Sequence, residues 1–387
     1  MSTQSSGAGP GGTGEAGPPA AETATHIARV IREHAVREKK KLVRRAAPDR
    51  SQRIRRIAQG LFAALNVWIG LQFYLWVRWF EIGGPGTPFA RPSGVEGWLP
   101  IAGLMNLKYL LVTGRVAAIH PAAMFLLVAF LLISVLLKKA FCAWLCPVGT
   151  LSEFLWKLGR RLFGRNLRMP RWLDLPLRGL KYVLLGFFAF VITAMSAAGL
   201  AAFMSSPYGM VADVKMLDFF RTIGATGIVV LLVLGALSVA IQNFWCRYLC
   251  PYGALLGLVS LLSPFKIRRD EVACIDCGKC AKACPANLKV GQRMQIRSVE
   301  CSACMACVAA CPVENALQFA LPPRPAITAG RWRGRVAGPR TVAAALACIF
   351  LGVVLFARMT GHWRTNLPQE IYARLVPHAN EVTHPGM

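Results

Sequence analysis

One cysteine spacing, present twice, constrains this chain more than any other feature of its sequence. The first run is C-x2-C-x2-C-x3-C-P, and it comprises Cys274, Cys277, Cys280, Cys284 and Pro285. The second run repeats the spacing with Cys301, Cys304, Cys307, Cys311 and Pro312. Three thiolates on one tight turn can cap three irons of a cubane, while the fourth cysteine reaches a second cluster. The spacing therefore predicts a compact module that holds two [4Fe-4S] clusters.

Exchange of the fourth cysteine fixes the ligand sets that we expect. Cluster 1 takes Cys274, Cys277, Cys280 and Cys311, and cluster 2 takes Cys284, Cys301, Cys304 and Cys307. Zinc sites also use the C-x2-C spacing, but two full copies of this run would be unusual for zinc. A disulfide framework is another interpretation of the 13 cysteines. Twelve of them, however, lie in CxxC or CxxxC spacings, which suit metal ligation in a reducing compartment.

Long apolar segments indicate that the rest of the chain lies in a membrane. Hydrophobic residues make up 55% of the sequence, and each span of a bilayer core requires roughly 20 helical residues. Five segments meet this requirement, at residues 57–80, 120–141, 179–204, 224–245 and 341–357. A sixth, residues 98–112, is shorter and contains Asn106 and Lys108, so we expect it to be interfacial or re-entrant. The sequence predicts a mainly α, polytopic helical membrane protein of about five spans, with an inserted α+β ferredoxin-like module.

The basic residues indicate how the spans are oriented. The formal net charge is +27, but these residues lie between apolar segments, which argues for contact with membrane lipids and against a nucleic-acid partner. Residues 142–178 hold seven basic and two acidic residues and residues 247–340 hold fourteen and five, whereas the other two loops are nearly balanced. Cytoplasmic loops carry the excess of Lys and Arg. We therefore expect a multi-pass protein of a bacterial inner (cell) membrane, with the N-terminus and the clusters cytoplasmic and the C-terminus periplasmic.

A second cysteine motif, CxxxCP, occurs at the ends of two predicted spans. Residues 141–151 and 245–255 share it, which indicates a tandem two-helix repeat, and its thiols are Cys142, Cys146, Cys246 and Cys250. Residues four apart share one face of a helix, and Pro147 and Pro251 are expected to mark where the chain leaves each membrane helix. The four thiols could converge on one further iron–sulfur centre. Inert buried thiols, dithiol–disulfide pairs, and a copper or other soft-metal site are the alternatives.

These features divide the chain into four parts. We expect a disordered tail and basic cytoplasmic flank over residues 1–56 and a four-span core with both CxxxCP motifs over 57–263. The ferredoxin-like domain takes residues 264–322, and a linker, a fifth span and a short periplasmic tail take 323–387. His120 could approach a quinone from the far side, although a structural role is commoner for a histidine at a helix start. Cys348, within the last span, is expected to be a core residue.

Two CxxxCP motifs followed by a two-cluster ferredoxin run resemble the membrane polyferredoxins of the NapH, NosR and FixG type. The resemblance covers roughly residues 61–319. It implies four spans that carry both CxxxCP motifs on the cytoplasmic side. It also implies electron movement between the quinone pool or a cytoplasmic donor and a partner oxidoreductase.

The leading hypothesis is therefore a membrane-bound iron–sulfur electron relay, with a redox partner protein and with quinol as a candidate donor. No phosphate-binding glycine loop, flavin motif or hydrolytic constellation occurs in the sequence, so we expect an electron-transfer subunit and not a self-contained catalyst. Two alternatives stay open. One is a metal reductase, for example for copper in respiratory-complex assembly, and the other is a redox-sensing or anchoring subunit.

Overall fold

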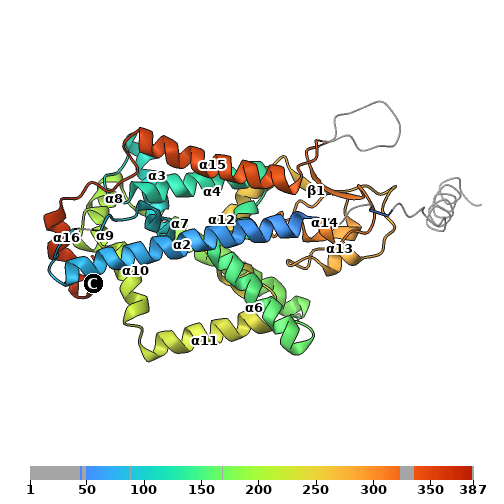
Figure 1. Ribbon diagram of the computed structural model, residues 1–387, viewed down its shortest axis with the longest axis horizontal. Helices are drawn as coiled ribbons and strands as arrows, with labels where there is room; N and C mark the ends of the chain where they lie inside the picture. Colours follow the sequence, from blue (N-terminus) through green and yellow to red (C-terminus); the bar gives the residue numbers. More distant parts are fainter. Residues whose placement is uncertain (1–43, 46–48, 88, 168, 323–334, 386–387) are drawn as a thin grey trace, which may run out of the picture. The chain divides into compact units, whose positions relative to one another are not determined.

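The computed structural model describes residues 44–45, 49–87, 89–167, 169–322 and 335–385. Residues 43–387 belong to one compact unit. The disordered tail that we predicted, and most of the basic flank after it, lie outside the described residues. Helices dominate the described chain, which also contains one two-stranded sheet (Figure 1). The mainly α prediction is therefore confirmed.

The elements carry the labels of Figure 1. In chain order they are α2 (Ser51–Glu81), η1 (Ser93–Trp98), α3 (Pro100–Thr113), α4 (Pro121–Leu137), α5 (Ala140–Trp144), α6 (Pro147–Phe163), α7 (Arg171–Ala194), α8 (Ala197–Met204), α9 (Pro207–Met210), α10 (Ala212–Arg221), α11 (Ala225–Ala240), η2 (Trp245–Leu249), α12 (Pro251–Val259), η3 (Ser260–Leu262), β1 (Lys266–Arg269), α13 (Lys279–Lys282), η4 (Val290–Gln292), α14 (Ala306–Ala309), β2 (Leu317–Ala320), α15 (Pro339–Met359), α16 (Gln369–Leu375) and η5 (Ala379–Glu381).

Three helices are long and apolar enough to cross a membrane, namely α2, α7 and α15. A fourth span is formed if α10 and α11, which are bent by 84° at a short break, are counted as one. The first and fifth segments that we predicted fall inside α2 and α15. The number of spans stays a prediction, because α4 is apolar but has only 17 residues.

Besides the segment 120–141, in which α4 ends at Leu137 and α5 begins at Ala140, two predicted spans are interrupted. The segment 179–204 is divided between α7 and α8, because Ser196 caps a new helix by accepting a hydrogen bond from the Gly199 N–H at 3.0 Å. The segment 224–245 ends as a helix at Ala240, since Ile241 adopts an extended backbone. The apolar run alone could not reveal these breaks, because both are set by short polar or extended links inside otherwise apolar sequence.

Helix α4 forms the centre of the described helical region. Most of its side chains are buried, and it contacts α3, α12 and α15. A helix that is apolar on all faces is stable only when other elements surround it. By contrast, α7 and α11 expose large apolar side chains, such as Trp172 at 76%, Phe190 at 72% and Leu232 at 68%. These outer surfaces suit contact with lipid.

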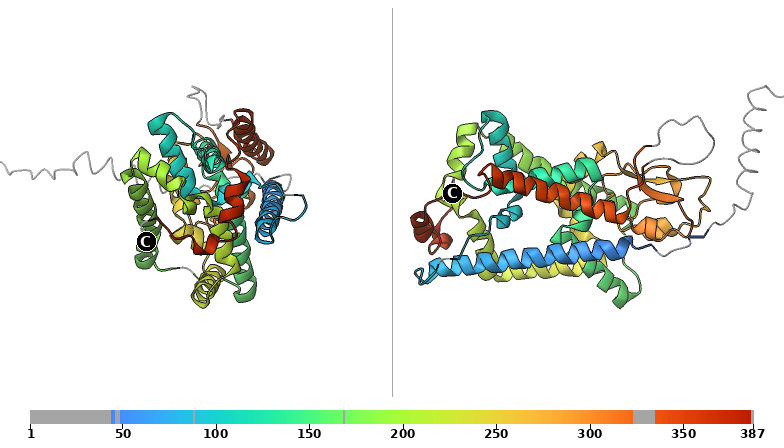
Figure 2. Two further views of the ribbon diagram at one scale, coloured as in Figure 1. Left: turned by 90° about the vertical axis from the view of Figure 1, so that its left-hand side faces the viewer. Right: turned by 45° about the horizontal axis from the view of Figure 1, so that its top comes forward.

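The cysteine-rich segment forms a small module at one end of this unit. Its strands β1 and β2 are antiparallel, with Lys266 opposite Ala320 and Arg269 opposite Leu317. The short helices α13 and α14 follow the cluster-binding turns. Helices α2 and α15 contact each other and run from this module to the opposite end, where α16 lies (Figure 2). The small sheet is consistent with the predicted ferredoxin-like module.

Candidate functional site

The four cysteines assigned to cluster 1 lie around one cavity of about 350 Å³. They are Cys274, Cys277, Cys280 and Cys311. The loop between them turns sharply, with positive φ at Asp276 (52°) and Gly278 (69°), which brings successive thiols to one side. Cys277 is exposed. An iron–sulfur group held here would lie near the outer surface of the module.

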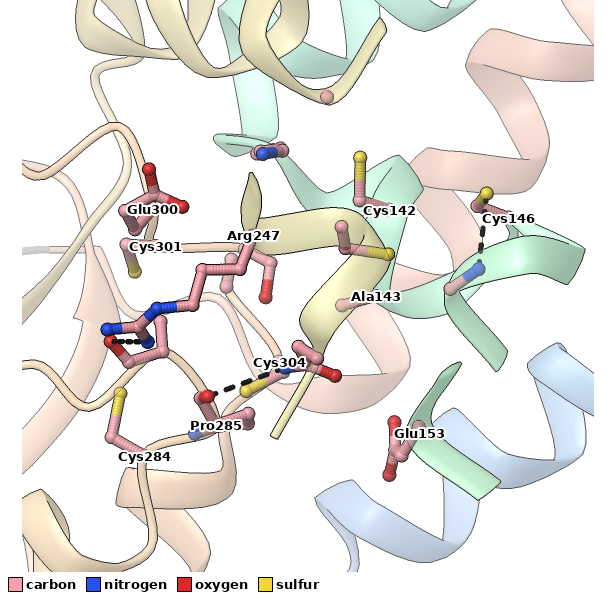
Figure 3. Close-up of a pocket in the computed structure, with 18 of the residues that line it drawn as sticks. Cys142, Ala143, Cys146, Glu153, Arg247, Cys284, Pro285, Glu300, Cys301 and Cys304 are labelled. Atoms are coloured by element: carbon pink, nitrogen blue, oxygen red, sulfur yellow. Dashed lines mark hydrogen bonds between the residues drawn. The ribbon is translucent and has the colours of Figure 1, made fainter. Parts of the chain in front are cut away.

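The four cysteines assigned to cluster 2 lie around a second cavity, of about 120 Å³, and the four CxxxCP thiols line the same cavity. Cys284, Cys301 and Cys307 are buried. In Figure 3, Cys142 and Cys146 lie on one side of this space, and Cys284, Cys301 and Cys304 lie on the other. We call it the thiol cavity. The structure thus brings together all eight of these sulfurs, which come from three separate parts of the sequence.

A direct hydrogen bond joins the two halves of the thiol cavity. The indole N–H of Trp144, which follows Cys142 on α5, donates to the carbonyl oxygen of Ala303 at 3.1 Å. Ala303 lies in the cluster 2 turn and has a φ of +49°. On the other side, the Gln52 side chain of α2 donates to the carbonyl oxygen of Cys304 at 2.9 Å. These contacts fix the module against the helical region through its cysteine-bearing loops.

The CxxxCP cysteines do not lie on continuous membrane helices, and our interpretation of the two prolines is wrong. Pro147 and Pro251 begin α6 and α12, in the first helical turn, where proline loses no hydrogen bond. Cys146 and Cys250 are the N-caps of these helices, and their sulfurs accept hydrogen bonds from Gly149 N–H at 3.5 Å and Gly253 N–H at 3.2 Å. A helix N-terminus favours negative charge, so this position stabilises a thiolate or an anionic group bound by it.

Buried cations surround the thiol cavity. Lys139 lines it and is 6% exposed, and Arg55 enters from α2 with both ends of its guanidinium 2.6 Å from the Glu153 carboxylate. Lys181 pairs with Glu300 at 2.5 Å. Burial raises the pKa of Cys142 to about 11 and that of Cys246 to about 12, so these thiols would stay protonated without a bound metal. Soft thiolates with adjacent cations are the donor set that iron–sulfur groups require.

A larger, mostly apolar cavity of about 570 Å³ lies between α2, α4 and α15, and we call it the membrane cavity. Phe141, Cys146, Val148, Cys250 and Tyr252 line both this cavity and the thiol cavity. Two CxxxCP sulfurs therefore lie on the boundary between the two spaces. At its other end the membrane cavity is lined by three arginines, Arg91, Arg358 and Arg364. This cavity could not be predicted from sequence, because its lining comes from six separated segments.

The weaker sequence candidates have different outcomes. His120 is buried, 2% exposed, and is described further below. Cys348 is exposed on α15, so its assignment to the core is wrong; it lies on the outward side of a helix that buries only Val342, Leu346 and Ala357. Within the described residues, no three His, Cys, Asp or Glu side chains, the cysteine sets included, are close enough together to hold a single metal ion.

Comparison with known proteins identifies the same regions. A family described as a 4Fe-4S binding domain matches residues 119–166 and 223–270, which contain the two CxxxCP motifs, and a 4Fe-4S dicluster domain matches residues 266–312. YccM of Escherichia coli, a candidate electron transport protein, is 52% identical over 330 residues, which is 85% of this chain and 91% of that protein. No solved structure matches the chain significantly.

More distant relatives share the central part of the chain. The ferredoxin-type protein NapH of Haemophilus influenzae is 28% identical over 46% of this chain and 59% of that protein. The regulatory protein NosR of Pseudomonas aeruginosa is 30% identical over 42% of this chain and 22% of that protein. With the cysteine motifs, the apolar helices and the extended similarity to YccM, the chain belongs to the family of membrane polyferredoxin-type iron–sulfur electron transport proteins that includes NapH and NosR.

Proposed function

We propose that this protein is a membrane-bound relay that carries electrons between a quinol in the membrane cavity and a redox partner at the outer surface of the ferredoxin-like module. Two [4Fe-4S] clusters would be held by the two cysteine sets named above. Iron–sulfur clusters supply one-electron transfer without proton chemistry. The direction of net flow depends on the reduction potentials of the donor and of the partner.

The observation that carries this proposal is the order of the three cavities. Cluster 1 cysteines surround the outermost space, cluster 2 cysteines line the thiol cavity, and two thiol-cavity sulfurs border the membrane cavity. Each space therefore shares residues or a short polypeptide link with the next one. An electron that enters at one end meets a continuous series of sulfur-lined sites.

The four CxxxCP thiols are proposed to hold a third redox centre. Their burial, their shared cavity and the cations beside them favour a bound anionic iron–sulfur group over free thiols, and both motifs fall within the match to a 4Fe-4S binding domain. A copper or other metal reductase would use the same thiols as a substrate site, and this stays the second candidate. Both candidates need a source of electrons in the module.

The proposed setting is a bacterial inner membrane with the module in the cytoplasm. The excess of basic residues around the cysteine-rich segment supports this orientation. A quinol suits the membrane cavity because that cavity is mostly apolar and opens among helices that expose apolar side chains.

The test replaces Cys142 and Cys246 by Ser together, with Cys348→Ser as the matched control because Cys348 is exposed and outside every motif. Cluster reduction is followed by EPR after addition of either a short-chain quinol or dithionite. We expect the double variant to lose reduction by quinol and to keep reduction by dithionite, and the control to behave as the wild type. Full reduction by quinol in the double variant would remove the CxxxCP thiols from the path. If the double variant could no longer reduce copper but its clusters were still reduced by quinol, the metal reductase would be favoured.

A further inference from the structure

A buried charged network lies at the end of the membrane cavity that is away from the cysteines. Arg91 donates to Glu96 at 2.8 Å and to Asp213 at 2.7 Å, and both carboxylate side chains are 0% exposed. Thr365 donates to Glu96 at 2.8 Å. The network joins η1, α4, α10 and the segment before α16. Arg91 alone among its charged members also lines the membrane cavity.

His120 completes this network and is the member that can gain or lose a proton near neutral pH. Its Nε2 lies 2.9 Å from the carbonyl oxygen of Gly209, so Nε2 carries a hydrogen and donates it. Its Nδ1 lies 3.3 Å from an Arg91 nitrogen and 3.5 Å from a Glu96 oxygen. In the neutral form Nδ1 accepts from Arg91, and in the charged form it donates to Glu96. His120 can therefore take up one proton at Nδ1 without losing its other contact.

The charge balance favours this uptake. Two carboxylates and one guanidinium leave a net charge of −1 in a region without solvent access, and an imidazolium would cancel it. Charged groups act on His120 from its neighbouring elements, namely Arg91 and Glu96 from η1 and its preceding loop and Asp213 from α10, and Tyr372 from α16 faces the same three charged groups. His120 also has a φ of +52°, a conformation that non-glycine residues rarely adopt without a local reason.

Polar atoms without protein partners flank the network. Within the described residues, the Tyr372 hydroxyl and the Asn106 Oδ1 are buried and have no hydrogen-bond partner. The Asn106 amide donates to the His120 carbonyl oxygen at 2.7 Å, and the Tyr372 ring packs on Trp76, over which the Arg91 guanidinium lies. Buried polar atoms of this kind are usually satisfied by ordered water. Such waters would connect His120 with the α10–α16 end.

The network and the cysteine sites lie at opposite ends of α2, far enough apart to fall on opposite sides of a bilayer core. Helix α2 contacts both, because Gln52 bonds to Cys304 and Trp76 lies against Arg91. These two residues are separated by about 36 Å at 1.5 Å per helical residue, which exceeds the hydrocarbon thickness of about 30 Å. The lining of the membrane cavity along α2, from Phe62 to Gln72, covers about 15 Å of that length.

We propose that His120, with Glu96 as its partner, accepts the protons of the quinol and releases them on the membrane side opposite the clusters. This inference rests on the proposed function. Oxidation of one quinol to quinone breaks two O–H bonds and yields two protons and two electrons. The electrons would leave singly toward the thiol cavity, where iron–sulfur groups held by its cysteines would act as the oxidant. Each proton would pass through a water beside Arg91, which lines the cavity and contacts His120, to His120 Nδ1, and then to water at the α10–α16 end. Electron transfer through this protein would thereby separate charge across the membrane.

The test uses proteoliposomes of the full-length protein that contain a quinol and a pH indicator in the lumen. Ferricyanide, added outside, is membrane-impermeant and oxidises only molecules whose module faces outward. We expect acidification of the lumen that matches the quinol consumed. Release of the protons on the outside would overturn the proposal but leave the relay intact. If quinol were oxidised no faster than in protein-free liposomes, the proposed function itself would be contradicted.

The matched variants are His120→Asn and His384→Asn. Asparagine tolerates the positive φ at position 120 but has no basic nitrogen, and His384 is an exposed histidine at the same end, in ring contact with Tyr208. We expect quinol-driven reduction to slow by roughly 10²-fold in His120→Asn, as on loss of a general base, with dithionite reduction unchanged. His384→Asn should match the wild type. Unchanged quinol-driven reduction and lumen acidification in His120→Asn would refute the role of His120.

Discussion

A methyl group added at Gly149 should disrupt the thiol cavity, whereas the same change at Gly253 should not. Both glycines follow the proline of a CxxxCP motif at equivalent positions of the repeat. A Cβ at Gly149 would lie 2.2 Å from the Cys142 carbonyl oxygen, while ordinary contact begins at 3.4 Å. A Cβ at Gly253 would meet its nearest neighbours, Cys250 Sγ and the Lys139 nitrogen, at 3.4 Å. The repeat therefore contains its own control.

The two distances set the expected magnitudes. In Gly149→Ala the obstacle is backbone, so α5 and α6 must separate by more than the neighbouring side chains can absorb, and overpacking of this kind costs about 1–3 kcal/mol. Gly253→Ala meets no obstacle, and it lowers the entropy of the unfolded chain by an amount equivalent to about 0.4–1 kcal/mol. The two variants should therefore differ by about 1.4–4 kcal/mol in the free energy of unfolding.

The assay is thermal unfolding in one detergent, together with iron content per chain. We expect Gly149→Ala to unfold several degrees below Gly253→Ala and to lose iron, since Cys142 is displaced by the new methyl group. Equal unfolding temperatures and equal iron content in the two variants would show that the close approach of Gly149 to Cys142 does not support the site.

Three further predictions concern contacts around the thiol cavity. Glu153→Gln should cost about 3–5 kcal/mol of stability, because it leaves the buried Arg55 guanidinium without its carboxylate. Arg55→Met should cost less, because Lys157 still pairs with Glu153, and a double-mutant cycle that gives no coupling energy would contradict this. Trp144→Phe should lower the free energy of unfolding by about 1–3 kcal/mol, because the Ala303 carbonyl oxygen loses its hydrogen bond. Ala303 lies in the cluster 2 turn, so the EPR signal of cluster 2 should shift and that of cluster 1 should not. Removal of iron by a chelator should increase proteolysis in the cysteine-bearing turns of residues 264–322 and leave α2 protected, because metal ligation would cross-link those turns. Limited proteolysis can check this.

The sequence predicted the parts of the fold that depend on local pattern. The expected spans 57–80 and 341–357 lie inside α2 and α15, and the two cysteine runs occupy the turns around α13 and α14. It did not predict the breaks at Ser196 and after Ala240. Each break depends on the backbone of one or two residues, a helix cap at Ser196 and an extended link at Ile241, inside a segment whose hydrophobicity predicts one continuous helix. The prolines of the CxxxCP motifs were misjudged for a related reason. Proline ends one helix and begins another with equal ease, and only the backbone of the preceding residues decides between them.

The site was less accessible to sequence reasoning than the fold. The eight module cysteines follow a spacing rule, and each expected set lines one cavity. The ligand sets themselves stay predictions. That the CxxxCP thiols line the cavity of the second set depends on tertiary packing of α5, η2 and the module. The network of Arg91, Glu96 and Asp213 gave no sequence signal, because its members are up to 122 positions apart and each alone resembles a loop charge.

The most direct test of the relay is anaerobic iron and sulfide analysis with an EPR redox titration of the wild type and of the Cys142→Ser, Cys246→Ser double variant. Two cubanes hold about eight irons. The wild type should contain more iron than this, and its EPR titration should show a third centre that a quinol reduces. The double variant should return to about eight irons and lose quinol-driven reduction. About eight irons in both proteins, with clusters that a quinol still reduces in the double variant, would contradict the account.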